Sequence, residues 1–569
     1  MKRTVGIGIQ DFEKILERKC FYVDKTMFVK EWWESGDDVT LITRPRRFGK
    51  TLTMSMMEHF LSIKCAGQEK LFESFKIWDY EKYREMQGTF PVINLSFANI
   101  KGNNYEFVRK NMCQVLTNLY SDYSFLLDEP VLSESDKEYF RKVSADMDDS
   151  TAVFALHQLS KYLYQYYGMK VIILLDEYDT PMQEAYVNGY WKEIVALIRS
   201  MFNSAFKTNP YLERAVLTGI TRVSKESIFS DLNNLEVVTS TSDKYAEIFG
   251  FTEQEVFDAM DEFSLPDKAL VKSWYDGFIF GTIKDIYNPW SIINFLAKGK
   301  VGNYWVNSSG NGLVGKLLQE GSAEIKVKFE TLLKGGTILC EIDEEIVYDQ
   351  LEKKKDAIWS LLLASGYLKV VQFEDGKQME TRGRKKPQYI LALTNKEVRY
   401  MFEDIVSGWF DNGNIANYND FVKALLLGDI KAMNRYMNRI ALNTFSYFDT
   451  GNRPSGSEPE RFYHGFVLGL LVELEGRYNL ISNRESGFGR YDVLLEPLNK
   501  EDNGIILEFK VYDSEEEKDL QDTVRAALKQ IEDKKYSQQL ISKGISGDCI
   551  CKYAFAFEGK KVLIGSDAS

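Results

Sequence analysis

Gly49, Lys50 and Thr51 follow one another directly after the apolar and basic stretch Leu41–Phe48. This order is typical of a strand that opens into a phosphate-binding loop, because backbone N–H groups and a helix N-terminus then face the anion. In such a loop Lys50 reaches the outer phosphates, and the Thr51 hydroxyl helps to hold Mg²⁺. We therefore expect ATP and Mg²⁺ as the cofactors of this region.

The loop departs from the strict GxxxxGK[ST] pattern, since Arg44 stands where the first glycine is expected. Pro45 restricts the backbone after Arg44, and the neighbouring arginines add positive charge that can contact phosphate. A basic turn before a helix is the alternative interpretation. The predicted cofactor-binding residues of the loop are Arg44, Arg46, Arg47, Phe48, Gly49, Lys50 and Thr51.

The segment Val171–Glu177 is a continuous apolar run that ends in two carboxylates. Such a run predicts a strand buried on both faces, similar to a Walker B strand. Asp176 would hold Mg²⁺ together with Thr51, and Glu177 would polarise the attacking water. The alternative is a buried strand whose terminal carboxylates face solvent.

A third predicted strand, Ala215–Thr218, runs into Gly219–Arg222. Open α/β sheets bind ligands at the carboxyl ends of their strands, so this segment would aim Arg222 at the same crevice. Arg222 is the candidate sensor of the γ-phosphate, and Thr218 is the weaker one. A solvated arginine in a turn is the alternative interpretation of Arg222.

A second chemical constellation lies near the C-terminus, where Gly487–Leu495 and Ile505–Val511 read as two strands joined by a polar turn. Alternate residues of a strand share a face, so Glu508 and Lys510 project together and Asp492 can meet them from the partner strand. Asp492 and Glu508 would hold Mg²⁺, while Lys510 would position water or stabilise charge. An ordinary hairpin with a cross-strand charge pair is the alternative.

The order of predicted elements suggests several domains in the 569 residues. Strands and helices alternate over residues 1–250, as a parallel sheet requires, and a mainly helical lid follows over 251–345. Residues 346–450 contain a helix, Ala357–Ala364, and a hairpin with the basic tip Thr381–Pro387, an arrangement like a winged helix. The C-terminal region, 451–569, begins with a linker at Gly451–Pro459 and continues into the C-terminal domain.

Composition indicates a large globular chain, with 44% hydrophobic and 14% aromatic residues. The N-terminus lacks the apolar core of a signal peptide, and the longest apolar runs are too short to span a bilayer, so we expect a cytoplasmic protein without membrane contact. The net charge of −13 argues against coating of nucleic acid by bulk electrostatics. A basic tip at 381–387 that touches DNA remains one hypothesis, and a solvated loop is the other.

Taken together, these segments resemble the AAA-ATPase-like bacterial proteins that carry a PD-(D/E)XK nuclease-like domain at the C-terminus. The resemblance rests on blocks spread over nearly the whole chain, namely Gly6–Phe12, Tyr22–Thr26, Arg44–Thr51, Leu175–Asp179, Thr218–Arg222, Trp274–Gly277 and Tyr287–Trp290, and on the C-terminal Glu485–Arg490 and Ala527–Ile531. It implies an arginine in place of the first loop glycine. It also implies that Gln530 is an accessory residue of the nuclease-like site, for which Glu460, Glu473 and Glu475 compete as a further acidic ligand.

The expected fold is α/β: a P-loop NTPase parallel sheet flanked by helices, then a helical and winged-helix-like region, then a restriction-endonuclease-like α/β domain. The expected function is an ATPase coupled to a Mg²⁺-dependent nuclease acting on DNA, with a homo-oligomer as a possible assembly in which Arg222, Arg46 or Arg47 acts across a subunit boundary. One alternative is a nucleotide-dependent switch or scaffold that binds nucleic acid or protein without cutting. Another is a DNA-binding regulator that acts through residues 357–393.

Overall fold

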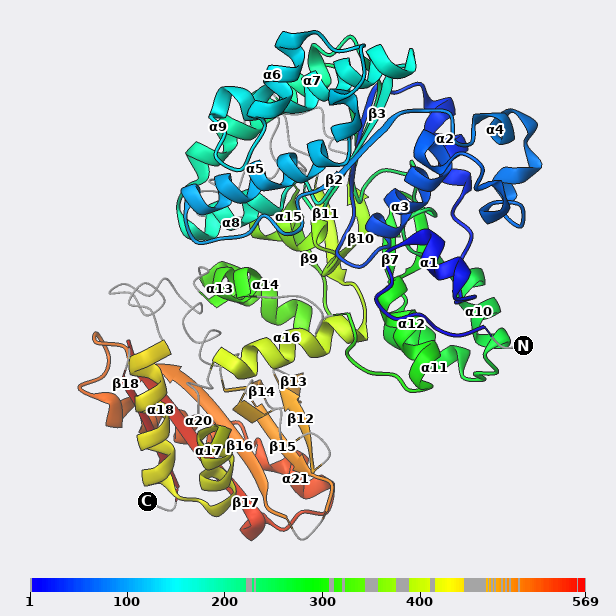
Figure 1. Cartoon of the computed structure of the whole chain (residues 1–569). Helices are drawn as coiled ribbons and strands as arrows, with labels where there is room; N and C mark the ends of the chain where they lie inside the picture. Colours follow the sequence, from blue (N-terminus) through cyan, green and yellow to red (C-terminus); the bar gives the residue numbers. More distant parts are fainter. Residues whose placement is uncertain are drawn as a thin grey trace, which may run out of the picture. The chain divides into compact units, whose positions relative to one another are not determined.

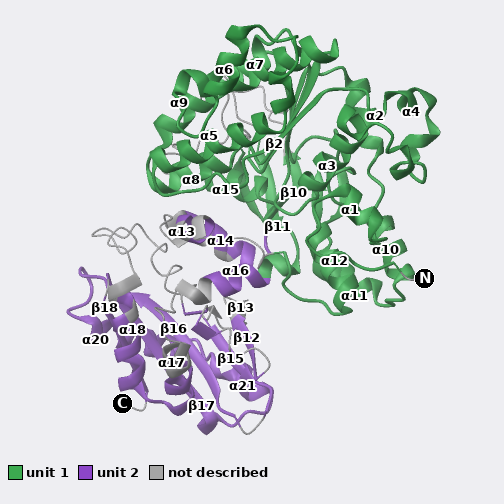
Figure 2. Ribbon diagram, in the orientation of Figure 1, with its two compact units in different colours: residues 1–310, 337–399 green, residues 311–336, 400–569 purple. Residues whose placement is uncertain are grey.

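The structure is a computed structural model of the chain and divides into two compact units (Figure 2). Unit 1 contains residues 1–310 and 337–399, and unit 2 contains 311–336 and 400–569. The described residues are 3–221, 228–229, 232–305, 312–319, 323–342, 357–374, 388–409, 415–444, 467–468, 470–471, 474, 477–482, 485–486, 489–490, 493–499, 502–559 and 561–567. Over these ranges no helix has the length and apolar content needed to cross a membrane.

A five-stranded parallel sheet forms the centre of unit 1, in the order β2-β3-β4-β1-β5 (Figure 1). Its strands are β1 (Val39–Thr43), β2 (Val92–Ser96), β3 (Val171–Asp176), β4 (Leu212–Gly219) and β5 (Leu235–Val238). All residues of β1 and β3 are buried, as the continuous apolar runs predicted. Strand β4 lies between β1 and β3, so the phosphate-loop strand and the acidic strand are separated by one strand.

Helices cover both faces of this sheet. On one face α1 (Phe12–Glu17), α2 (Met27–Ser35) and α3 (Lys50–Leu61) bury Phe12, Trp32 and Met57 against Ile172, Leu174 and Val216 of the strands. On the other face lie α5 (Tyr105–Ser121), α7 (Asp149–Tyr167), α8 (Thr180–Asn188) and α9 (Trp191–Phe202). A π-helix over Asn203–Lys207 continues α9 after Phe202.

The expected lid region contains a small antiparallel sheet that the mainly helical prediction missed. Its order is β6-β8-β7. The elements here are β6 (Phe251–Thr252), α10 (Glu253–Glu262), α11 (Lys268–Tyr275), β7 (Phe278–Phe280), β8 (Ile283–Tyr287) and α12 (Pro289–Lys298). Helix α10 begins with a capping box, since the Thr252 hydroxyl accepts from Glu255 N and the Glu255 carboxylate accepts from Thr252 N.

Within the predicted winged-helix-like and helical region, 346–450, the residues up to 399 belong to unit 1. The residues from 400 onward belong to unit 2. Helix α15 (Ala357–Ala364) precedes β10 (Leu368–Glu374), and β10 pairs with β11 (Gln388–Leu393), which pairs in turn with β9 (Ile338–Glu341). The predicted helix and hairpin strands are thus confirmed. The basic tip, 381–387, falls outside the described residues. Helix α16 (Lys396–Trp409) begins in unit 1 and ends in unit 2.

Unit 2 is built on a five-stranded mixed sheet in the order β12-β15-β16-β17-β18. The strands are β12 (Tyr478–Ser482), β15 (Val493–Pro497), β16 (Gly504–Val511), β17 (Ile550–Glu558) and β18 (Lys561–Ser566). Helices α17 (Ile415–Leu427) and α18 (Ile430–Thr444) pack on one face, and α20 (Leu520–Asp533) and α21 (Ser537–Ser542) pack on the other. This arrangement matches the α/β domain expected for the C-terminus.

Strand β18 pairs with β17 on one side, and on its outer side its backbone is bonded by side chains of α18. The Asn434 side-chain amide donates to Ile564 O and accepts from Ile564 N, both at 2.8 Å. Asn438, one helical turn later, bonds Val562 O at 2.6 Å and Val562 N at 3.0 Å in the same way. The two asparagines satisfy backbone groups that an open edge would leave exposed to other chains.

Gly277 provides a test of how the lid region packs on the segment at 394. Its φ of +127° is unfavourable for other residues, and a Cβ would lie 2.1 Å from the Thr394 carbonyl oxygen. We expect Gly277→Ala to destabilise unit 1 by about 2–4 kcal/mol, through backbone strain and the clash together. Urea unfolding followed by circular dichroism measures this cost.

Gly36→Ala is the matched control, because Gly36 has a φ of +77° but nothing lies within 4 Å of the place that a Cβ would take. It should cost only about 1–2 kcal/mol, from the left-handed backbone alone. Equal losses in the two variants would contradict the close contact with Thr394.

Candidate functional site

The phosphate loop leaves β1 at Thr43 and enters α3 at Lys50. Two residues of the loop, Arg47 (φ +65°) and Gly49 (φ +81°), have left-handed backbone conformations. Gly49 is the N-cap of α3 and has no side chain with which to cap the helix. The first N–H groups of a 12-residue helix therefore face the loop, where an anion would satisfy them.

Lys50 points back into the loop. Its Nζ donates to Arg44 O at 2.9 Å and to Pro45 O at 3.0 Å, and the residue is only 3% exposed. The loop carbonyls thus hold the ammonium group at the start of α3.

Asp176 at the end of β3 binds hydroxyls from both neighbouring elements. Thr51 Oγ1 donates to Asp176 Oδ2 at 2.6 Å, and Thr218 Oγ1 donates to Asp176 Oδ1. Thr51, Asp176 and Thr218 are thereby brought together at one edge of the sheet, as the sequence predicted. Burial raises the pKa of the Asp176 carboxyl, and the two hydroxyls oppose that shift.

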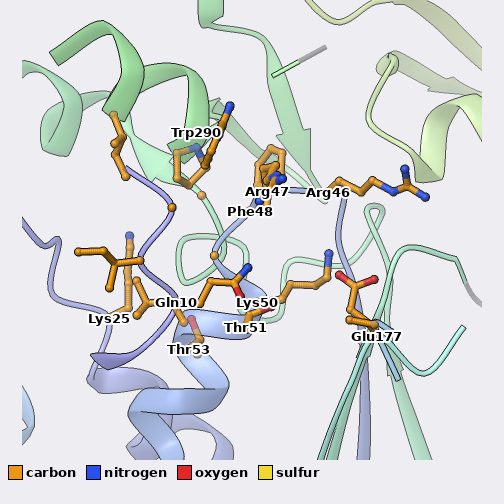
Figure 3. A pocket seen from close by; sticks show the side chains of 18 of the residues that line it. Gln10, Lys25, Arg46, Arg47, Phe48, Lys50, Thr51, Thr53, Glu177 and Trp290 are labelled. Atoms are coloured by element: carbon orange, nitrogen blue, oxygen red, sulfur yellow. The ribbon is translucent and has the colours of Figure 1, made fainter. Parts of the chain in front are cut away.

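Glu177 follows in a left-handed conformation, with a φ of +55°. Its N–H donates to Thr218 Oγ1 at 3.4 Å, and its carboxylate accepts from Thr180 Oγ1 at 3.4 Å. In Figure 3 the Glu177 carboxylate and the Lys50 amine point toward the same space. A carboxylate in this place can orient a water molecule in that space.

Arg44 does not line the cavity, in contrast to the prediction that it contacts phosphate. Its guanidinium is fully buried, donates to the carbonyls of Thr43, Thr239 and Lys244, and lies 4.4 Å from the ring centroid of Phe280. Burial lowers the pKa of Arg44 to about 9, which leaves it cationic at neutral pH. The side chain occupies the interior beneath the loop and joins β1 to the segment after β5.

The other loop residues are held by the lid region. The Arg47 guanidinium lies 4.4 Å from the ring centroid of Trp290, and Phe48 packs edge-on against Phe278 and Phe280. The Arg46 carbonyl accepts from Asn288 Nδ2 at 3.3 Å and from Trp305 Nε1 at 3.0 Å. The loop backbone is therefore fixed by residues more than 200 positions away.

A cavity of about 370 Å³ opens beside the loop (Figure 3). Its lining includes the loop and acidic residues Arg46, Arg47, Gly49, Lys50, Thr51 and Glu177. It also includes the apolar residues Ile9, Phe21, Val23, Ile248, Phe251 and Ile293, together with the polar Gln10 and Lys25. A ligand with an anionic group and an apolar body would fit such a lining.

Several residues of this region were missed by the motif-based prediction. Gln183, Thr180 and Lys25 line the cavity, and Asp179 lies buried behind it. Asp179 and Gln183 are four residues apart at the start of the helix that follows the acidic strand. This spacing places both side chains on one face of the helix and could have identified them. Arg222 falls outside the described residues, although Thr221 before it is described.

The C-terminal constellation centres on β16. Glu508 is buried at 2% exposure, and Gln530 Nε2 of α20 donates to its Oε1. Lys510, two residues along the strand, is partly exposed and shares the face of Glu508. The predicted partner strand is present, with Val493 paired to Leu507. Asp492, the residue before Val493, lies outside the described residues, as do Glu460, Glu473 and Glu475.

Asp176→Asn should stabilise the protein without nucleotide at neutral pH. Because burial raises the folded-state pKa of Asp176, stability falls as pH rises from the unfolded value of about 3.9 through the folded one. Removing the charge should raise the Tm by about 2–4 °C at neutral pH, and the gain should shrink toward pH ~4. Differential scanning calorimetry at both pH values measures it, with exposed Asp128→Asn as the control. A gain that is independent of pH would contradict this origin.

Comparison with known proteins agrees with this geometry. The chain is 26% identical over 405 residues to the "Uncharacterized protein in vnfD 5'region" of Azotobacter chroococcum mcd 1, a match that covers 70% of this chain and 69% of that protein. Residues 6–229 match the AAA-ATPase-like family, described as a predicted AAA-ATPase. Residues 458–567 match the PD-(D/E)XK nuclease superfamily. The chain therefore joins an AAA-ATPase-like domain to a C-terminal domain of the PD-(D/E)XK nuclease superfamily.

Proposed function

We propose that unit 1 binds and hydrolyses ATP with Mg²⁺, and that nucleotide state controls Mg²⁺-dependent cutting of DNA by the C-terminal domain. The observation that carries the ATPase proposal is the Thr51–Asp176 hydrogen bond. It joins the start of the loop helix to the end of the acidic strand, where a metal bound to a triphosphate needs a hydroxyl and a carboxylate.

The residues of unit 1 have different proposed roles in ATP binding and hydrolysis. The N–H groups at the start of α3 and the Lys50 ammonium hold the phosphate chain. Thr51 and Asp176 hold Mg²⁺, which neutralises phosphate charge when bound. Glu177 orients the attacking water, and Arg46 and Arg47 provide further cations at the cavity. The apolar residues of the cavity lining accept the base.

In the C-terminal domain, Glu508 and Asp492 are proposed to hold Mg²⁺, and Lys510 to assist the attacking water. The support is the burial of Glu508 on a core strand, since a carboxylate removed from water is costly without a compensating partner. The Gln530 amide donates to this carboxylate and so orients it. The substrate proposed for this site is DNA.

Lys50→Ala tests the ATPase proposal. Loss of the ammonium should lower ATP turnover at least about 100-fold, because Lys50 is the cation that the loop carbonyls hold at the start of α3, where charge develops on the outer phosphates. Phosphate release from Mg²⁺-ATP measures the rate, and exposed Lys192→Ala serves as the control. Normal turnover by the Lys50 variant would refute the proposal.

Lys510→Ala and Asp492→Ala test the nuclease proposal. Both should abolish Mg²⁺-dependent cleavage while leaving ATP turnover within about twofold of the parent, since the two sites lie in separate units. Cleavage is measured on single- and double-stranded DNA and RNA, with and without ATP. A parent protein that hydrolyses ATP, binds nucleic acid and cuts none of these substrates would favour the switch or scaffold alternative.

A further inference from the structure

Gln183 connects the phosphate loop to the end of β4 through its side-chain amide. Arg46 Nη2 donates to Gln183 Oε1 at 3.2 Å, and Gln183 Nε2 donates to Asp179 Oδ2 at 2.9 Å. Because Gln183 lines the cavity, this chain of hydrogen bonds runs along the wall beside Glu177 and Lys50.

Asp179 carries the connection onward to the backbone after β4. The same Oδ2 accepts from Ile220 N at 3.0 Å, Thr221 N at 2.9 Å and Thr221 Oγ1 at 3.0 Å. Gly219 permits this close approach, since a Cβ there would lie 2.8 Å from Asp179 Oδ1. Asp179 thus fixes the two residues that lead directly into Arg222.

The burial of the Asp179 carboxylate costs free energy of folding. Asp179 is fully buried, and burial together with the nearby Glu177 charge raises its pKa. Hydrogen bonds from four donors onto one oxygen compensate part of that cost. A hydrophobic side chain at position 179 could pack against the same elements without this desolvation cost. The hydrogen bonds of Asp179 are therefore expected to serve a purpose other than packing.

We infer that Gln183 is a positioning residue for hydrolysis, because it aligns the Arg46 guanidinium with the phosphates. Through Asp179 it also fixes the position of the Ile220–Thr221 segment relative to Arg46. The inference rests on the proposed ATPase function. The Arg46 backbone is already fixed by Asn288 and Trp305, so the direction of its side chain is what Gln183 sets.

An amide is needed because the position requires an acceptor on one side and a donor on the other. Glutamine provides both, whereas glutamate accepts from Arg46 but places a second carboxylate beside Asp179. Gln183→Glu therefore separates the two halves of the connection, and Gln183→Ala removes both.

The test compares steady-state hydrolysis of Mg²⁺-ATP and ADP affinity in the full-length parent, Gln183→Ala and Gln183→Glu. Removing an alignment made in the transition state should lower kcat about 10–100-fold in Gln183→Ala, with KM and the Kd for ADP changed less than about threefold. Gln183→Glu should also lose at least about tenfold in kcat. A structural role alone would instead weaken ADP binding and lower the Tm with it.

Gln114→Ala is the matched control, since Gln114 makes a similar bond four residues along an exposed helix, to Asn118 at 2.8 Å. It should leave kcat unchanged. If Lys50→Ala is inactive while both Gln183 variants keep the parent kcat, the positioning role is overturned and the ATPase proposal stands. If Lys50→Ala turns over ATP normally, the ATPase proposal and the positioning role fall together.

Discussion

The buried Asp176 carboxylate is the constraint on which the nucleotide-binding unit depends. It accepts one hydroxyl from the loop helix and one from β4, so three segments must end at the same level of the sheet. The pairings of Ile42 with Thr218 and of Leu175 with Leu217 achieve this. A slip of one residue would turn Asp176 to the opposite face, and the carboxylate would lose both partners.

The conformation of the phosphate loop is stabilised by contacts with distant parts of the chain. Arg44 occupies the interior beneath the loop, and Trp305 and Asn288 hold the Arg46 carbonyl from above. Trp305 is held in turn by the fully buried carboxylate of Glu397, which accepts from the Trp305 backbone N–H at 2.7 Å. The same carboxylate also accepts from Tyr304 N and Ser291 Oγ. This support explains how a loop without the usual first glycine keeps a left-handed Arg47 in place.

The C-terminal unit uses amide side chains for comparable tasks. Gln530 orients the buried Glu508, while Asn434 and Asn438 satisfy the backbone of the edge strand β18. The two asparagines do this because an amide is donor and acceptor at once, whereas Gln530 donates to Glu508. Strand β16 pairs with β15 and β17 without a register shift, so Glu508 and Lys510 keep the alternation on which their shared face depends.

Local patterns in the sequence were enough to predict the parallel sheet, the buried strand that ends in Asp176, and the C-terminal strand that carries Glu508, because apolar runs and motif spacing are properties of neighbouring residues. The roles of Arg44, Asp179 and Gln183, and the small sheet at 251–287, could not be predicted in this way. The partners of these residues lie far along the chain or belong to another element, as Arg44 with Thr239 and Asp179 with Thr221 show. Only folding brings such groups within hydrogen-bonding distance, so the tertiary structure alone decided that Arg44 supports the loop from inside while Arg46 faces the cavity.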